Sequence, residues 1–182
     1  MSDPVYDAFL RRQQEEGLAL ARDSRVLDLL PMSDAADRYL ARFTCRGLVR
    51  DDAGVIVEAE EFAVGICFPE DYVRRANPFE VMTWLGPRNV WHPNISDTRP
   101  VICVGRLGPG TALVDLLYQC WEIITWNKAT IREDDALNKP ACQWARHNLA
   151  RLPVDTRPLK RRLLDVHVED ASPRSGVREP KA

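Results

Sequence analysis

The chain has 182 residues, of which 45% are hydrophobic and 29% are charged, and its formal net charge is -2 at pH 7. This length suits one domain with short extensions, and the near-neutral charge gives no reason to expect nucleic acid or an anionic membrane as a partner. No apolar run reaches the roughly 18 residues of a membrane-spanning helix, and residues 1–16 lack the basic-then-apolar order of a secretory signal, so we expect a protein of the cytoplasm.

Residues 3–22 are predicted to form an amphipathic helix, because apolar residues recur among charged ones at helical spacing. Ser2 or Asp3 can cap the first free N–H groups, and Pro4 suits the first helical position, where a missing N–H does no harm. The short apolar run at 26–30 that follows is either a first strand or a continuation of this helix.

Three further strands are predicted where apolar and polar residues alternate, at 39–46, 61–68 and 81–85. The residues at 51–54 have the composition of a turn. The first half of the chain is therefore one helix followed by three or four strands in succession, which indicates an antiparallel meander.

The segment 87–110 is rich in Pro, Gly and Asn and shows no periodicity, although it contains enough apolar residues to be held in place. Long irregular segments inside a domain are usually functional or disordered. A buried helix is predicted at 113–126, where apolar residues follow helical spacing. Asp134 or Asp135 can open another helix, with Pro140 in an early position.

The last part of the chain has few apolar residues. Leucines at 159, 163 and 164 indicate one more short helix, and the polar sequence beyond it is typical of disorder. We therefore expect a single domain over 1–166 and a flexible tail over 167–182.

The five cysteines are odd in number, widely spaced and without a CxxC pair, at positions Cys45, Cys67, Cys103, Cys120 and Cys142. This pattern fits neither a disulfide framework nor a zinc site, so no metal is expected. Each cysteine is then a small core residue or a reactive thiol. Four of them fall on predicted strands or helices, which favours the core, whereas Cys103 falls in the irregular segment.

Four motifs follow one another in the middle of the chain: a Phe-Pro with an acidic residue and Tyr, a His-Pro-Asn tripeptide, an Ile-Cys, and an Asp-Asp-x-Leu after a long apolar helix. They read Phe68-Pro69-Glu70-Asp71-Tyr72, His92-Pro93-Asn94, Ile102-Cys103 and Asp134-Asp135-Ala136-Leu137. This order resembles the ubiquitin-conjugating enzymes, and with the first helix the resemblance covers residues 5–150.

The resemblance implies an α+β fold with an N-terminal helix, a four-stranded antiparallel meander and then helices packed on the sheet. It also implies that Cys103 accepts a ubiquitin-like modifier from an activating enzyme as a thioester and passes it to an amine on a target protein. No cofactor is expected, because a thiolate alone can carry the acyl group through two easier transfers.

The His-Pro-Asn tripeptide supplies the next candidates. The Asn94 amide can donate to the oxyanion of the tetrahedral intermediate, or it can hold the loop by bonding backbone groups, and both roles stay open. His92 invites a general-base interpretation. The resemblance instead favours His92 and Pro93 as structural support of the active-site loop.

Outside the tripeptide, the resemblance implies that Asp135 orients the incoming lysine, although Asp134 and Asp135 are equally suited to cap a helix. It implies that Arg11 and Arg12 on the first helix meet the activating enzyme, the alternative being a solvated charged face.

Departures from the family pattern indicate a distant branch. The spacing from Asn94 to Cys103 is one residue longer than usual, and 104–107 differs from the usual residues after the cysteine. The chain thus resembles bacterial conjugating enzymes of ubiquitin-like modification operons linked to anti-phage defence. Two other functions stay open: a catalytically inactive scaffold of the same fold, which Cys103 argues against, and a cysteine hydrolase, for which no His partner can be named.

Overall fold

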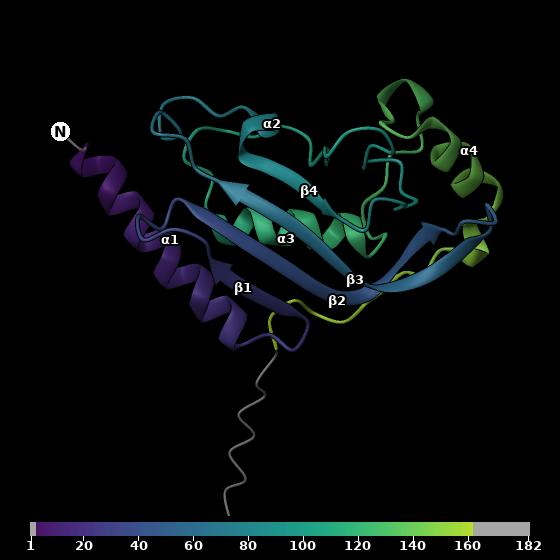
Figure 1. Ribbon diagram of the computed structural model, residues 1–182, viewed down its shortest axis with the longest axis horizontal. Coiled ribbons are helices and arrows are strands. Elements are labelled where there is room, and N and C mark those ends of the chain that lie inside the picture. The colour runs from purple at the N-terminus through teal and green to yellow at the C-terminus, as the bar shows by residue number, and fades with distance from the viewer. Residues whose placement is uncertain (1–2, 162–182) are drawn as a thin grey trace, which may run out of the picture.

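A four-stranded antiparallel sheet organises residues 3–161, the part of the chain that the computed structural model describes (Figure 1). In chain order the elements are α1 (Pro4–Arg22), β1 (Leu27–Pro31), β2 (Arg38–Arg50), β3 (Ile56–Cys67), α2 (Pro78–Val81), β4 (Met82–Gly86), α3 (Leu113–Ile124), the 3-10 turn η1 (Glu133–Asp135), α4 (Lys139–His147) and the 3-10 turn η2 (Leu149–Arg151). Within the described residues no helix is both long and apolar enough to cross a membrane.

The first helix begins as predicted. The Asp3 side chain accepts a hydrogen bond from the Val5 N–H, and Pro4 occupies the first turn. The run at 26–30, for which helix and strand were both open, forms β1, which pairs with β2. α1 then packs along β1 and against α3.

The sheet is a meander in the order β1-β2-β3-β4, as predicted, and every pairing is antiparallel. The register places Ala41 of β2 between Leu29 and Val64, and all three side chains are buried. α3 covers this inner face, where the Phe43 and Trp121 rings lie 6.2 Å apart. The core is therefore built between one face of the sheet and α3.

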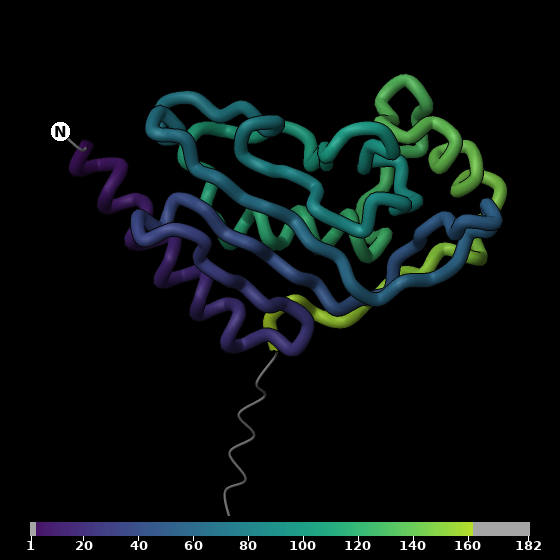
Figure 2. Tube along the Cα trace, in the orientation of Figure 1, coloured from purple at the N-terminus to yellow at the C-terminus, as the bar shows by residue number. Residues whose placement is uncertain are grey.

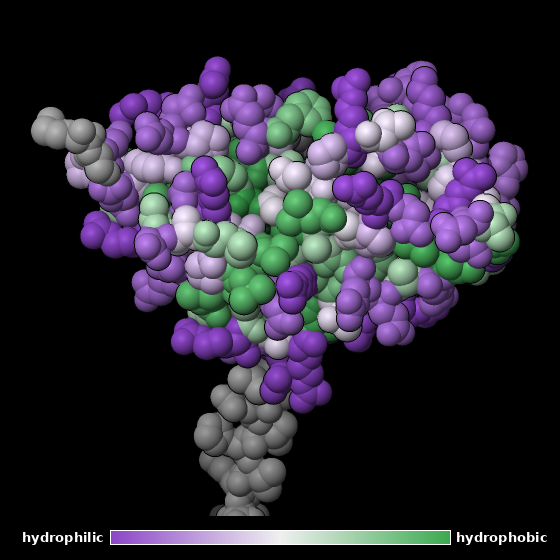
Figure 3. Space-filling model, in the orientation of Figure 1, coloured by the Kyte–Doolittle hydropathy of each residue, from purple (hydrophilic) through white to green (hydrophobic). Residues whose placement is uncertain are grey.

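The outer face of the sheet carries a row of apolar residues. Leu30 and Leu85 are 43% and 52% exposed on the two edge strands. Between them Gly65 lies opposite Leu40, and a Cβ on Gly65 would come within 3.3 Å of Leu85. Figure 3 shows this hydrophobic area near the centre of the visible face.

The predicted start of the next helix was wrong. Asp134 and Asp135 lie in η1 and make no capping bond, whereas α4 begins at Lys139, after Asn138, whose Oδ1 accepts from the Ala141 N–H. The physical reason is Pro140, which is tolerated only in the first turn because deeper in a helix it would remove a hydrogen bond and clash with an earlier carbonyl.

After η2 an extended strap, residues 152–161, runs back beneath the sheet to the end of α1 (Figure 2). The prediction of a short helix over 159–166 was wrong at its start, since Leu159 is not helical and instead fills the core, 1% exposed. The remainder of that segment and the predicted flexible tail, 167–182, lie outside the described residues.

Candidate active site

The irregular segment 87–112 is held in place although it contains no regular element. Ile95 and Ile102 are buried and form an antiparallel bridge, and Val90 bridges Val49 of β2. The Trp91 N–H also donates to the Leu48 carbonyl at 2.8 Å. These anchors fix the tripeptide 92–94 and the cysteine that follows it on one end of the sheet.

The environments of the five cysteines differ. Cys45, Cys120 and Cys142 are buried, and burial raises the pKa of the Cys45 and Cys120 thiols to about 12. Cys67 and Cys103 are partly exposed. The interpretation of Cys67 as a core residue was wrong, because it follows the inward-facing Ile66 and therefore lies on the outer face of the sheet. Cys103 is the partly exposed cysteine outside any strand or helix.

Asn94 joins the cysteine segment to the chain that follows α3. Its carbonyl accepts from the Cys103 N–H at 2.8 Å, and its Nδ2 donates to the Cys103 carbonyl at 3.2 Å. Its Oδ1 accepts from the Thr130 N–H at 2.8 Å. Both polar atoms of the nearly buried amide are thus bonded to backbone, one of them to the cysteine itself.

His92 has the geometry of a loop support. Its buried Nδ1 accepts from the Asn94 N–H at 3.0 Å, so the ring proton is assigned to Nε2. The ring lies 4.3 Å from the Trp126 ring, centroid to centroid, and desolvation by burial lowers the pKa of His92 to about 3. A neutral, buried ring bonded to its own loop is poorly placed to take a proton from an incoming group.

Pro93 anchors the other end of the segment after α3. Its carbonyl accepts from the N–H groups of Leu137 and Asn138 at 2.9 and 3.2 Å. Because Thr130 is bonded to Asn94, both ends of 130–138 are fixed to the tripeptide. Asp135 lies on this connection, 59% exposed, with its Oδ2 at 3.3 Å from Nε of Arg132. The connection therefore borders the cysteine segment, and the Asp135 carboxylate faces solvent beside an arginine.

Lys128 is a feature that the sequence did not reveal. Its Nζ donates to the Val104 carbonyl at 2.9 Å, directly after the candidate cysteine. Its own N–H donates to the Glu122 carbonyl at 2.8 Å, which fixes the lysine at the end of α3. Lys128 lies in a stretch without periodicity, so no spacing pattern could have pointed to it.

Arg11 and Arg12 are not brought to this site. Both lie on α1, at the opposite end of the molecule from α4 (Figure 1). Arg12 pairs with Glu16 at 2.8 Å, and Arg11 lines a hollow between α1 and the residues around Asp37 and Asp71. Within residues 3–161 no group of three His, Cys, Asp or Glu side chains could hold a metal ion.

The comparisons with known proteins agree at the level of the fold. No protein-family model and no curated protein matches the sequence. A solved structure described as a novel ubiquitin-conjugating enzyme is similar, with a TM-score of 0.54 and 13% identity over 79% of this chain and 86% of that one.

Two further structures are of the same kind. The E2 domain of a Toxoplasma gondii ubiquitin-conjugating enzyme gives a TM-score of 0.51 and 15% identity over 77% of this chain and 88% of that one. A putative ubiquitin-conjugating enzyme from Plasmodium yoelii gives a TM-score of 0.51 and 18% identity over 78% of this chain and 85% of that one. The α+β fold of ubiquitin-conjugating enzymes, expected from the sequence, is therefore confirmed.

Proposed function

We propose that this chain is a conjugating enzyme that carries a ubiquitin-like modifier as a thioester on Cys103 and transfers it to an amine of a target protein. The observation that carries the proposal is the partly exposed Cys103, bonded through its own N–H and carbonyl to Asn94 within this fold. Residues 1–166 are proposed to form the single domain that does so.

The two steps use the same thiolate. In loading, the Cys103 thiolate attacks the thioester carbon of the modifier, a new C–S bond forms, the C–S bond to the activating enzyme breaks, and the thiolate of that enzyme leaves. In discharge, the target amine attacks that carbon, the C–N bond forms, the C–S bond breaks, and the proton that the amine loses restores the Cys103 thiol. Each step passes through a tetrahedral oxyanion, which a nearby donor stabilises.

Asn94 is proposed to have two roles: its main role is to hold the cysteine segment, and its second role is to donate a hydrogen bond to the oxyanion. One N–H of its amide is already bonded to the Cys103 carbonyl, and one is left to donate. His92 and Pro93 support the same loop. Asp135, on the connection 130–138, is proposed to orient the incoming amine. To do so, its carboxylate must leave its ion pair with Arg132 and pair with the ammonium of the acceptor.

The partners follow from this reaction: an activating enzyme, the modifier and a target protein. Arg11 and Arg12 on α1 are proposed to contact the activating enzyme. We also propose a bacterial, cytoplasmic setting in a ubiquitin-like modification operon linked to anti-phage defence. Neighbouring genes test this setting directly, since the proposal requires an activating enzyme and a ubiquitin-like protein to be encoded beside this chain.

The deciding experiment is a loading assay. The chain is mixed with an activating enzyme and a ubiquitin-like protein encoded beside its gene and with ATP, and the products are separated with and without reductant. A band that reductant removes and that is absent from Cys103→Ser is expected. Cys67→Ser, which removes the other partly exposed thiol, is the matched control and should load normally.

Two results contradict the proposal. Loading that survives Cys103→Ser but fails in Cys67→Ser moves the carrier to the other thiol. No band with partners that load a second, known conjugating enzyme leaves the chain as an inactive scaffold of this fold.

A further inference from the structure

An ammonium that forms no ion pair within residues 3–161 lies directly beyond the candidate carrier cysteine. Lys128 Nζ is 2.9 Å from the carbonyl oxygen of Val104, the residue after Cys103. A Cβ placed on Gly105, the next residue, would lie 3.8 Å from the same nitrogen. Lys128 therefore contacts the turn that leads out of the cysteine, where Gly105 has a φ of +98°.

The backbone around Cys103 has few regular partners, because the segment belongs to no strand or helix. Asn94 takes the N–H and the carbonyl of Cys103, and Lys128 takes the carbonyl of Val104. Two side chains from different parts of the sequence thus fix two successive peptide groups. Removing the lysine leaves the carbonyl of the buried Val104 without this donor.

In the described part of the chain, no carboxylate cancels the charge of Lys128. No ion pair of this lysine occurs among residues 3–161, and an ammonium that gives one N–H to Val104 keeps two more. Asn94, by contrast, has already used one of its two N–H donors on the Cys103 carbonyl. A fixed positive charge beside a thioester favours the anionic tetrahedral intermediate over the neutral ground state.

We propose that Lys128 is a positioning residue for thioester transfer, which holds the turn at 104–105 and keeps a positive charge beside the acyl group on Cys103. The inference rests on the proposed carrier role of Cys103. It assigns to Lys128, in the loop after α3, an electrostatic role in the proposed reaction, in addition to the role of holding the loop that it shares with Asn94.

The test uses a small probe, so that no partner surface is involved. The full chain in a Cys67→Ser background is incubated with the mercaptoethanesulfonate thioester of acetylglycine, and acylation of Cys103 is followed by intact-mass spectrometry. The acyl protein is then desalted and discharged with free lysine. Lys128→Met is compared with Lys128→Arg, which keeps the charge and donors, and with Lys160→Met, a lysine on the strap that pairs with Asp23.

We expect Lys128→Met to slow discharge about tenfold, a loss of ~1.4 kcal/mol in transition-state stabilisation, and Lys128→Arg to restore the rate to within about threefold. Lys160→Met should match the parent. Lys128→Met should also lower the melting temperature by several degrees, because the carbonyl of the 1%-exposed Val104 loses its donor, so discharge is compared at a temperature where every variant is folded. A loss of rate that is measured on folded protein and rescued by arginine is then due to the lost charge and donors at residue 128 rather than to unfolding.

Three results overturn the inference. Lys128→Met discharging at the parental rate removes any role in transfer, while leaving the carrier role of Cys103 intact. Equal losses of discharge rate in Lys128→Met and Lys128→Arg exclude a role for the positive charge at this position. Recovery of the acyl group on Lys128 itself would make this residue an acceptor. Failure of the parent to load at all with its activating enzyme is a different result, and it contradicts the proposed function instead.

Discussion

Asn94 and His92 show how one tripeptide holds the surrounding loops in place through a few individual hydrogen bonds. The Asn94 side chain spans the gap between Cys103 and Thr130, and His92 accepts from the Asn94 N–H. Neither contact requires a substrate to be present. Both residues therefore contribute to the free energy of unfolding, whatever part they take in the proposed reaction, and their variants separate the two contributions.

Asn94→Ala is expected to lower the free energy of unfolding by about 1–3 kcal/mol, because it leaves the Thr130 N–H and the Cys103 carbonyl without partners. Asn94→Asp keeps the acceptor for Thr130 and should recover part of that loss. Urea unfolding of the three proteins measures the difference. If Asn94→Ala unfolds like the parent while its discharge alone slows, the oxyanion role is the larger one and the loop-holding role is secondary.

His92 is expected to make stability fall in mild acid. Its pKa is about 3 in the folded state and near 6.5 when unfolded, so below pH 6.5 the unfolded chain binds a proton that the folded chain does not. Stability should then drop by up to about 1.4 kcal/mol per pH unit between pH 6 and 4. His92→Asn, which keeps an acceptor for the Asn94 N–H, should lose less over this range. If the curves of stability against pH are parallel for the parent and His92→Asn, His92 is not the source of the fall in mild acid.

At the scale of elements, hydrophobic periodicity predicted the strands and helices that bury one face. The alternation at 61–68 and the spacing of Leu113, Leu116 and Cys120 gave β3 and α3, because burial of one face imposes those periods. The contacts that shape the candidate site could not be predicted from periodicity. Lys128 meets Val104, and Asn94 meets Thr130, across stretches in which each residue is placed by one hydrogen bond rather than by a repeated face. The start of α4 was missed because aspartate is as well suited to capping as asparagine, and Asp134 and Asp135 come first in the sequence.

The cap of α4 can be tested by substitution. Asn138→Ala should destabilise the protein by about 1 kcal/mol or more, since Asn138 accepts from the Ala141 N–H and is buried. Asp134→Ala, which changes an exposed residue of η1 with no capping bond, should stay within about 0.5 kcal/mol of the parent. Thermal unfolding of both variants checks this. A larger loss in Asp134→Ala would place the start of the helix where the sequence alone suggested.

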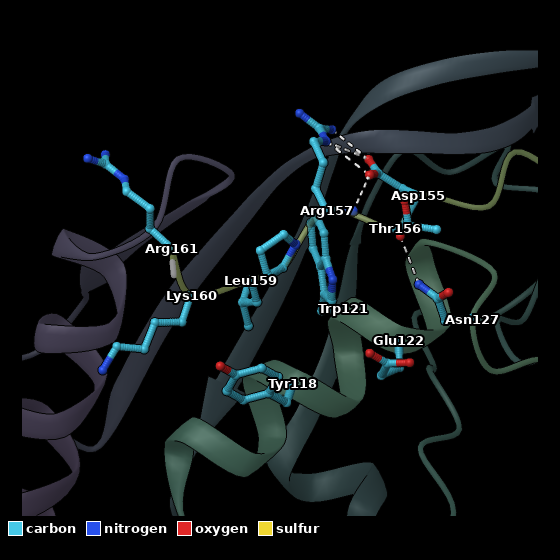
Figure 4. Close-up of a pocket in the computed structure, with 11 residues that line it drawn as sticks. Tyr118, Trp121, Glu122, Asn127, Asp155, Thr156, Arg157, Leu159, Lys160 and Arg161 are labelled. Carbon is cyan, nitrogen blue, oxygen red and sulfur yellow. Dashed lines mark hydrogen bonds and ion pairs between the residues drawn. The ribbon is translucent and has the colours of Figure 1, made fainter. Parts of the chain in front are cut away.

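At the scale of the whole molecule, the strap closes the fold by returning the chain to its beginning. The Asp155 N–H donates to Thr125 after α3, the Arg157 guanidinium reaches the Thr44 carbonyl of β2, and the Arg161 N–H donates to the Asp23 carbonyl after α1. Figure 4 shows Arg157 facing Asp155, with Trp121 and Tyr118 of α3 bordering an open pocket of about 530 Å³ that strap residues line. Its prolines and charges gave no periodic signal, so the sequence did not predict it.

The strap is expected to be part of the cooperative unit rather than an appendage. Leu159 is 1% exposed inside the core, so Leu159→Ala should lower the free energy of unfolding by about 2–4 kcal/mol through lost burial and the cavity left behind. Val154→Ala, on the same strap but 43% exposed, removes less apolar contact and should change it by less than about 0.5 kcal/mol. Guanidinium unfolding followed by tryptophan fluorescence measures both, and Trp121 beside the strap reports the transition. Equal, small effects in the two variants would mean that the strap detaches before the core unfolds, and the fold would then be complete at η2.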